Sequence, residues 1–301
     1  MSMPRPRPEL EPEPLYGEIF DRGYQRYEGP RFGQRHAMRA LWGYSIARAF
    51  GVKKRWTAKV IPIVLYVGVA MPVIISIGIK AFLPDASVLE YWDFFAFVFL
   101  LQGVFAATVA PELLCGDRQE RVLTLYFARA ISRAGYLVSK ALAAATMMLT
   151  MSLAPAIVLW LGRQLLDDSP LSAMRDHLPD LLRLTVGSVM VSLYLGAGGL
   201  MIASFTKRKA IAVAVTLVVT LVAAGLSAAL AAVIGSDLRR FLVFLSPPTT
   251  ISGMALSLFG REATIEPYGD ALLPLWQYLA AMGGTVMIAL VVMAWRYLPD
   301  E

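Results

Sequence analysis

Six long apolar runs constrain the fold of this chain more than any other feature. A helix needs about 20 apolar residues to cross the hydrocarbon core of a bilayer, which is about 30 Å thick. The runs approach or exceed that length and cover residues 60–79, 94–114, 141–161, 182–205, 210–234 and 273–295. The sequence therefore predicts an all-α integral membrane protein with six transmembrane helices.

Composition excludes several other classes of protein. Of the 301 residues, 57 % are apolar and 17 % are charged, whereas a soluble domain carries about 25 % charged residues. The one cysteine, Cys115, and the two histidines, His36 and His177, cannot build a disulfide framework or a zinc cage. The sequence also has no Gly-x-x-x-x-Gly-Lys-Ser/Thr phosphate-binding loop. We therefore expect this chain to bind no metal, cofactor or nucleotide of its own.

Lysine and arginine are distributed unevenly between the connecting segments. Of the 28 such residues, 21 lie in the segments that share one side of a six-span topology, which are residues 1–59, 115–140, 206–209 and 296–301. Because cytoplasmic segments are enriched in Lys and Arg, both termini are predicted to be cytoplasmic. The same asymmetry accounts for the net charge of +6, so nucleic acid is not an expected partner.

The segment before the first span is predicted to have two parts. Prolines alternate with charged residues within 1–31, which is typical of a disordered cytoplasmic tail. Over 32–56, apolar side chains recur at helical spacing beside several arginines. This pattern predicts an amphipathic helix in the membrane interface, with an ordinary cytosolic helix as the alternative. The side chains expected at the lipid headgroups are Arg35, Arg39, Trp42, Lys53, Lys54 and Arg55.

The six-span domain, residues 57–301, contains one further apolar segment at 241–260. Pro247 and Pro248 divide this segment into halves, and neither half is long enough to cross a bilayer core of about 30 Å. A pair of re-entrant half-helices between spans five and six is therefore predicted. A pair of helices on the membrane surface is the alternative.

Ionisable groups are almost absent from the six apolar runs. The only acid in these runs is Glu112, which lies near the cytoplasmic end of the second run. Because ion-coupled transporters normally carry an ionisable group inside their helices, we expect the energy for transport to come from a cytoplasmic partner. Two alternatives stay open, namely an ATP-independent channel or secondary transporter, and an integral membrane enzyme.

The cytoplasmic loop over 115–140 and its flanks carry a known pattern. An apolar span ends in a glutamate, a charged turn follows, and a short amphipathic stretch leads to a Ser-Arg turn and a lysine. The residues that carry it are Glu112, Asp117, Glu120, Leu123, Leu125, Ser132, Arg133, Tyr136 and Lys140. This pattern resembles the type-2 ABC exporter permeases, which have a G-subfamily-like fold. The departures are Arg121 and Val122 in place of a common Gly-Thr, and Ala130 and Ile131 where the family has a proline before the Ser-Arg turn.

The resemblance implies a function and a set of partners. The chain would be the transmembrane permease subunit of an ATP-driven exporter in the bacterial inner (cytoplasmic) membrane. A separate ABC ATPase, in two copies, would bind ATP and Mg, and a second permease, either this chain again or a homologue, would complete the assembly. A coupling helix within 117–128 would contact the ATPase through an apolar strip of Val122, Leu125 and either Tyr126 or Phe127. The predicted ATPase-coupling residues are Glu112, Asp117, Arg118, Glu120, Arg121, Leu125, Arg129 and Arg133.

The resemblance also implies a substrate path. Spans two and five face the dimer axis in the family, and an apolar lining with few hydrogen-bonding groups suits a hydrophobic or lipid-like substrate. The predicted lining residues are Phe99, Gln102, Phe105, Thr108, Thr216 and Thr220. The alternative is that these residues face lipid, as apolar stripes on membrane helices usually do.

Overall fold

The computed structural model describes residues 29, 32–52, 55–83, 88–128, 131–234, 237–261, 265, 268 and 273–298. The described residues from Gly33 onward belong to one compact unit. The predicted tail over 1–31 lies outside the described residues except for Gly29, and so do three predicted site residues, Lys53, Lys54 and Arg129.

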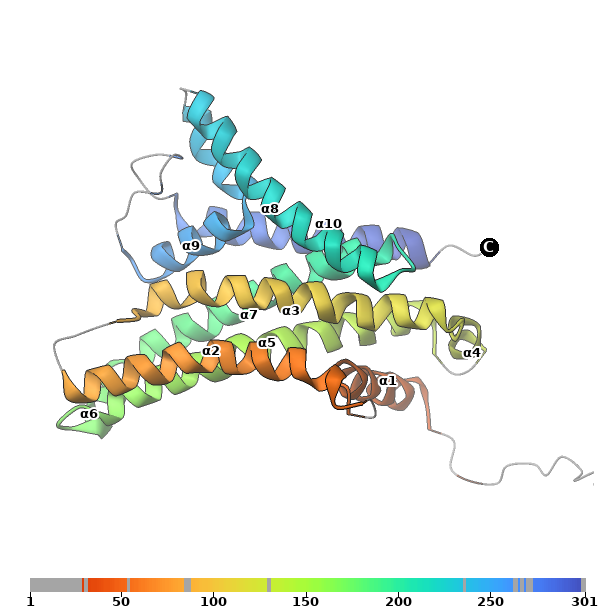
Figure 1. The fold of residues 1–301 in the computed structure, drawn as a ribbon, viewed down its shortest axis with the longest axis horizontal. Helices are drawn as coiled ribbons and strands as arrows, with labels where there is room; N and C mark the ends of the chain where they lie inside the picture. The colour runs from red at the N-terminus through yellow and green to blue at the C-terminus, as the bar shows by residue number, and fades with distance from the viewer. Residues whose placement is uncertain are drawn as a thin grey trace, which may run out of the picture. The chain divides into compact units, whose positions relative to one another are not determined.

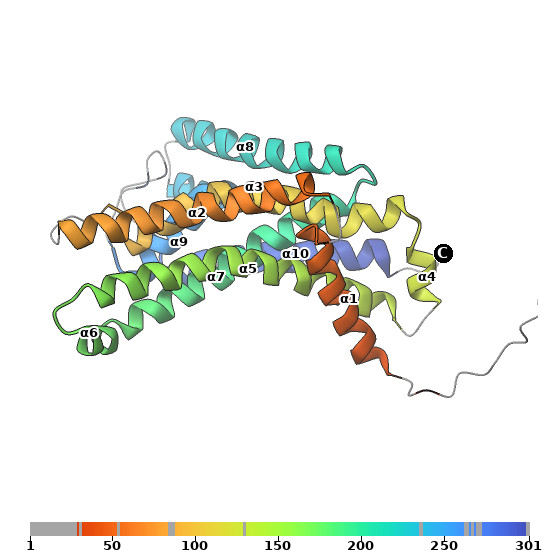
Figure 2. The same cartoon turned by 60° about the horizontal axis from the view of Figure 1, so that its bottom comes forward.

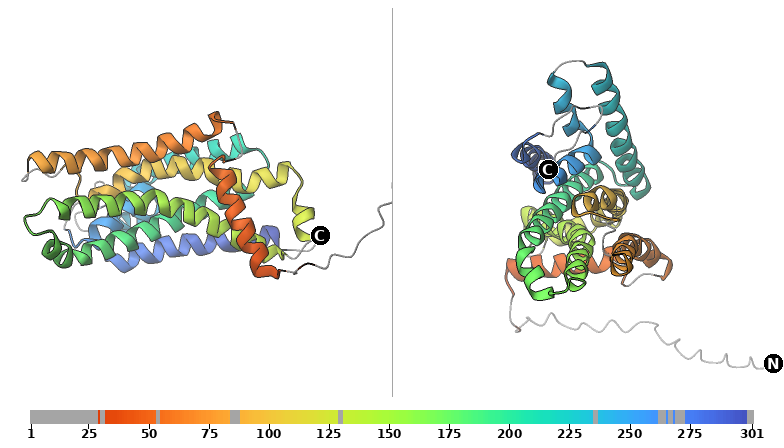
Figure 3. Two further views of the ribbon diagram at one scale, coloured as in Figure 1. Left: turned by 90° about the horizontal axis from the view of Figure 1, so that it is seen from below. Right: turned by 90° about the vertical axis from the view of Figure 1, so that its left-hand side faces the viewer.

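Long helices packed side by side make up this unit (Figure 1). Counting the bent helix pair described below as one span would give seven spans. Within the described residues, six single helices are long and apolar enough to cross a membrane, which is the predicted number. They are α2 (Thr57–Phe82), α3 (Tyr91–Gln119), α5 (Arg133–Leu165), α7 (Leu178–Ser204), α8 (Lys209–Val233) and α10 (Leu275–Tyr297). Two short helices, α4 (Leu123–Phe127) and α6 (Pro170–Asp176), lie in the connections of α3 to α5 and of α5 to α7. The first lies at the same end of the bundle as the C-terminal end of α10, and the second lies at the opposite end (Figures 1 and 3).

The second and third spans are longer than their apolar runs. The run 94–114 becomes a helix that continues to Gln119, and the run 141–161 becomes one that begins at Arg133. Ser132 caps the latter helix, because its hydroxyl oxygen accepts a hydrogen bond from the backbone N–H of Gly135 at 3.1 Å. The additional turns carry charged residues, so a search for apolar residues cannot detect them.

Helix α1 (Gln34–Ala49) crosses α5 obliquely and buries Leu41 and Ser45 (Figure 2). It is shorter than the predicted helix over 32–56. Gly51 ends it with a φ of 69°, and the N–H of Val52 donates to the carbonyl oxygen of Ala47 at 2.9 Å. This pairing is a Schellman motif, in which the left-handed position favours glycine.

A bent pair of short helices lies between the fifth and sixth spans, as predicted. Segment η1 (Asp237–Leu245) and α9 (Pro247–Leu258) meet at a bend of 109°. Pro247 begins α9, where a helix has no partner for a backbone N–H. The hydroxyl of Thr250 donates to the carbonyl oxygen of Val243 at 2.9 Å and so connects the two halves.

The core lies where α5 and α7 pack along each other, with α3 and α10 against them (Figure 3). Gly187 of α7 lets α3 approach closely, because a Cβ atom there would lie 2.5 Å from the ring of Phe95. Deeper in the bundle, the side-chain amide of Gln102 donates to the carbonyl oxygen of Met148 at 2.9 Å and to the hydroxyl of Ser192 at 3.2 Å. The three central spans are therefore joined by hydrogen bonds as well as by packing.

Candidate functional site

A group of charged side chains joins four helices at the α4 end of the bundle. The guanidinium of Arg48, from α1, contacts three carboxylates of the α3 end: Glu112 at 3.3 Å, Asp117 at 3.2 Å, and Glu120. Burial opposes the charged form of Arg48. The hydrogen bond to Glu120 and the charges of the three carboxylates outweigh that effect and raise the pKa of Arg48 above its usual range. Arg48 is therefore a permanent cation in this cluster.

Asp117 is the most deeply buried member of the group. Its second carboxylate oxygen lies 2.8 Å from the ammonium of Lys140, which is itself buried, and accepts a hydrogen bond from the hydroxyl of Tyr136 at 3.0 Å. The other oxygen of Glu112 lies 2.7 Å from the ammonium of Lys209, at the start of α8. We call the following six residues the polar cluster: Arg48, Glu112, Asp117, Glu120, Lys140 and Lys209.

The formal charges of the polar cluster cancel, with three acids against three bases. Buried charges are tolerated when they are paired, and removal of one partner leaves the other uncompensated. Gly116 provides the space for this arrangement, because a Cβ atom there would lie 2.7 Å from a guanidinium nitrogen of Arg48. The cluster therefore fixes α1, α3, α5 and α8 relative to one another.

A tight turn connects this cluster to α4. The N–H of Val122 donates to the carbonyl oxygen of Asp117 at 3.2 Å, and Arg121 has a φ of 54°. This is again the Schellman geometry, and Arg121 occupies the left-handed position that glycine prefers. The departure from the family pattern at this position thus places a side chain where the backbone is strained.

The α4 helix divides its apolar side chains between two sides. Tyr126 and Phe127 pack on the ring of Tyr136, with 5.9 Å between ring centroids in each case. Burial raises the pKa of Tyr126 to about 12. Leu125 points outward and is 63 % exposed. The predicted strip is therefore split, and Leu125 is its exposed apolar member on this helix.

The predicted coupling arginines have different environments. Arg118 faces into the chain, where it donates to the carbonyl oxygen of Ser204 and lies over the ring of Tyr297 at 4.5 Å. Arg133 lies over the ring of Phe127 at 5.6 Å. Arg121 is exposed. The exposed part of the predicted coupling surface is thus smaller than the sequence pattern indicates.

Most of the predicted substrate-path side chains are buried or form hydrogen bonds within the chain. Gln102 and Phe105 are completely buried, in contact with neighbouring helices rather than with an open surface. Phe99 and Thr108 are partly exposed on α3. On α8, the hydroxyls of Thr216 and Thr220 donate to carbonyl oxygens of their own helix, as Thr108 does on α3.

The predicted interface residues lie on and just after α1. Arg35 and Arg39 are exposed, and the indole N–H of Trp42 donates to the hydroxyl of Thr146 at 3.3 Å. Arg55 is also exposed. Trp42 therefore ties α1 to α5 near the two arginines.

Sequence reasoning missed Arg48 and Lys209 as partners of the acidic residues. The sequence does indicate that Glu112 has a partner, because an acid near the end of an apolar run must be paired when it is buried. The sequence does not say which of the many nearby bases is the partner, since the pairs are separated by 64 and 97 residues.

Comparison with known families gives a match that covers most of the chain. Residues 23–301 match the family described as "ABC-2 family transporter protein". No curated protein matches the chain.

Proposed function

Because this chain belongs to the ABC-2 family of transporter membrane proteins, and is thus a multi-pass transport permease, we propose that it couples ATP hydrolysis on a separate ABC ATPase to export across the bacterial inner membrane. The family's membrane domain lacks a nucleotide-binding site. ATP and Mg would therefore bind to the ATPase, which we propose is present in two copies. A second permease, identical or homologous, would complete the assembly.

We propose that both termini are cytoplasmic. Helices α1 and α4 and the C-terminal end of α10 lie at one end of the bundle (Figure 1). The turn with Lys207, Arg208 and Lys209 precedes α8 at this same end, where Lys209 contacts Glu112. This placement and the excess of basic residues support a cytoplasmic side here. The bent pair of η1 and α9 would then re-enter the bilayer from the opposite side.

The polar cluster is the observation that carries the coupling proposal. A displacement of α4 by the ATPase would be transmitted to α5 through Tyr126 and Phe127, which pack on Tyr136. Tyr136 donates to Asp117, and Asp117 also pairs with Arg48. The ion pairs connect this motion to α1, α3 and α8, so several helices would move together when the ATPase changes shape.

Leu125 is the side chain that we propose contacts the ATPase. It is exposed, apolar and located on a short helix that two long spans hold in place. An apolar anchor in the centre of an interface contributes about 2 kcal/mol or more to binding. Exposed Arg121 and Glu120 lie near it and would contribute charged contacts.

The test replaces Leu125 in the permease co-purified with its ATPase. Leu125→Glu is expected to weaken ATPase binding about 30-fold, which corresponds to about 2 kcal/mol, and to abolish export. Leu171→Glu is the matched control, because Leu171 is 85 % exposed on α6 at the other end of the bundle. Thermal unfolding of both variants checks that each is folded. Wild-type binding and export by Leu125→Glu would contradict the assignment of α4 as the coupling helix.

The substrate path is proposed along α3 and α8. Phe99 and Thr108 are partly exposed on α3, and the hydroxyls of Thr216 and Thr220 bond to their own helix. The lining would then be mostly apolar, which suits a hydrophobic substrate. Phe99→Asp should lower export of such a substrate without lowering ATPase binding, and equal loss of both would contradict this path.

A further inference from the structure

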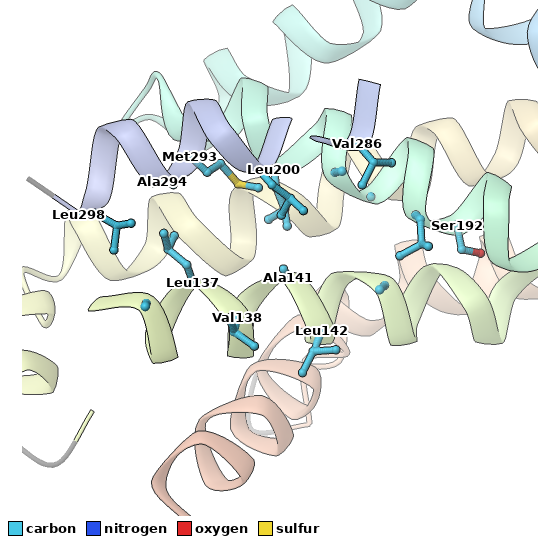
Figure 4. A pocket seen from close by; sticks show the side chains of 16 residues that line it. Leu137, Val138, Ala141, Leu142, Ser192, Leu200, Val286, Met293, Ala294 and Leu298 are labelled. Atoms are coloured by element: carbon cyan, nitrogen blue, oxygen red, sulfur yellow. The ribbon is translucent and has the colours of Figure 1, made fainter. Parts of the chain in front are cut away.

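A groove runs between α5, α7 and α10, with a volume of about 390 Å³ (Figure 4). Its lining is apolar apart from Ser192, and prominent members are Leu137, Val138, Ala141, Leu142, Leu200 and Met293. Along α5 the lining residues recur every three or four positions from Ala134 to Ala145, and this stripe is about 16 Å long at about 1.5 Å per residue. That length matches one leaflet of hydrocarbon, which is about half of 30 Å.

A second cavity of about 390 Å³ lies between α1 and α5 and adjoins this groove. Leu142 lines both cavities. The second one is lined by Arg35, Met38, Arg39, Trp42, Ser139, Leu142 and Thr146. It therefore combines two cationic groups, an indole and two hydroxyls, beside an apolar groove.

The charged side chains that line the second cavity are both cationic. Arg35 and Arg39 are both exposed, and neither forms an ion pair with any residue that the structure describes. Among those residues, no acid lines either cavity. Guanidinium groups match the geometry of phosphate oxygens, and a tryptophan is typical of the level of the lipid headgroups. The cavity is thus complementary to a phosphate that carries apolar chains.

We propose that the two cavities together bind one anionic phospholipid. Its phosphate lies between Arg35 and Arg39, and one acyl chain lies along the groove past Leu142. The headgroup contact holds α1 against α5 in addition to the hydrogen bond from Trp42 to Thr146. A lipid is the ligand that supplies both a phosphate and an apolar chain of one-leaflet length.

The test measures lipid retention on the purified full-length chain by native mass spectrometry. The chain is titrated with phosphatidylglycerol or with phosphatidylcholine, and one phosphatidylglycerol is expected to bind about tenfold more tightly. The double variant Arg35→Gln, Arg39→Gln should lose that preference, because both guanidiniums are gone. Arg55→Gln is the matched control, since Arg55 is exposed after α1 but lines neither cavity.

A second variant tests the groove separately. Ala141→Phe places a ring in the groove and should lower phosphatidylglycerol retention while thermal unfolding stays close to that of the wild type. Equal retention of the two lipids by the wild type would overturn the proposal. So would an unchanged preference in the double arginine variant, unchanged retention in Ala141→Phe, or displacement of the lipid by glycerol phosphate at an equal concentration.

Discussion

The neutralisation of Asp117 is the most direct test of the polar cluster. Asp117→Asn keeps the shape of the side chain and removes its charge, so that Lys140 and Arg48 lose a carboxylate at 2.8 Å and 3.2 Å. Lys140 and Arg48, the two cationic partners of Asp117, are largely buried. Removing one partner of a buried ion pair lowers the free energy of unfolding by about 3–5 kcal/mol. We expect a loss in this range.

A double-mutant cycle separates the charge effect from other causes. Lys140→Met removes the unpaired ammonium, so Asp117→Asn with Lys140→Met restores the balance of charges in the cluster. The double variant should therefore be more stable than Asp117→Asn alone, with an interaction energy of about 2–3 kcal/mol between the sites. The assay is chemical unfolding of the purified chain in mixed micelles, followed by tryptophan fluorescence. Additive losses, or a loss below about 1 kcal/mol for Asp117→Asn, would refute the reasoning.

Three further predictions test other parts of the structure. Arg121→Gly should raise the free energy of unfolding by up to about 1 kcal/mol, because glycine adopts the left-handed conformation of 54° without strain; Arg121→Val should lower it in the same unfolding assay. Gly187→Ala should lower stability by about 1–3 kcal/mol, since the new Cβ would lie 2.5 Å from the Phe95 ring, whereas Gly198→Ala, with no atom within 4 Å, should not lower it. Tyr126 has a pKa raised from 10.0 to about 12 by burial, so its contribution to stability is complete below pH 10 and is lost as the pH rises toward 12. Tyr126→Phe should accordingly show a smaller loss of stability between these pH values than the wild type, and Tyr44→Phe, at an exposed position, should behave like the wild type.

The spans were predictable because the bilayer imposes one simple condition on them. Any stretch of about 20 apolar residues must be helical to satisfy its backbone in hydrocarbon, whatever its neighbours are. The break at Pro247 was predictable for a similar local reason, since the two consecutive prolines remove two backbone donors, whereas the isolated prolines of α2, α3 and α5 stay inside their helices. The resemblance of 110–140 to a known pattern then pointed to the family, and the family match confirmed it.

The polar contacts were not predictable, because they join residues far apart in the chain. Glu112 is an isolated acid in the sequence, and its two partners are brought to it by α1 and α8. The position of Arg118 in the charged turn predicts an exposed arginine that contacts the ATPase. In the structure its guanidinium packs on the ring of Tyr297 instead. Helical spacing predicts that Gln102 and Phe105 lie near each other on α3, but spacing carries no information about which helices cover them, which are α5 and α7 for Gln102 and α2 for Phe105.

The position of the polar cluster determines how this protein responds to bilayers of different thickness. Helix α5 has 33 residues and α8 has 25, which correspond to about 50 Å and about 38 Å at about 1.5 Å per residue. Helices joined by ion pairs cannot slide past one another to adjust their hydrophobic lengths. Hydrophobic mismatch must then be accommodated by tilt of the whole bundle, by deformation of the lipid, or at the opposite end near α6, where the polar cluster does not tie the helices together. Membrane thickness would thus act first on the far end of α8, because α3 and α5 are also joined at that end by the ion pair of Arg163 with Glu90 at 3.1 Å.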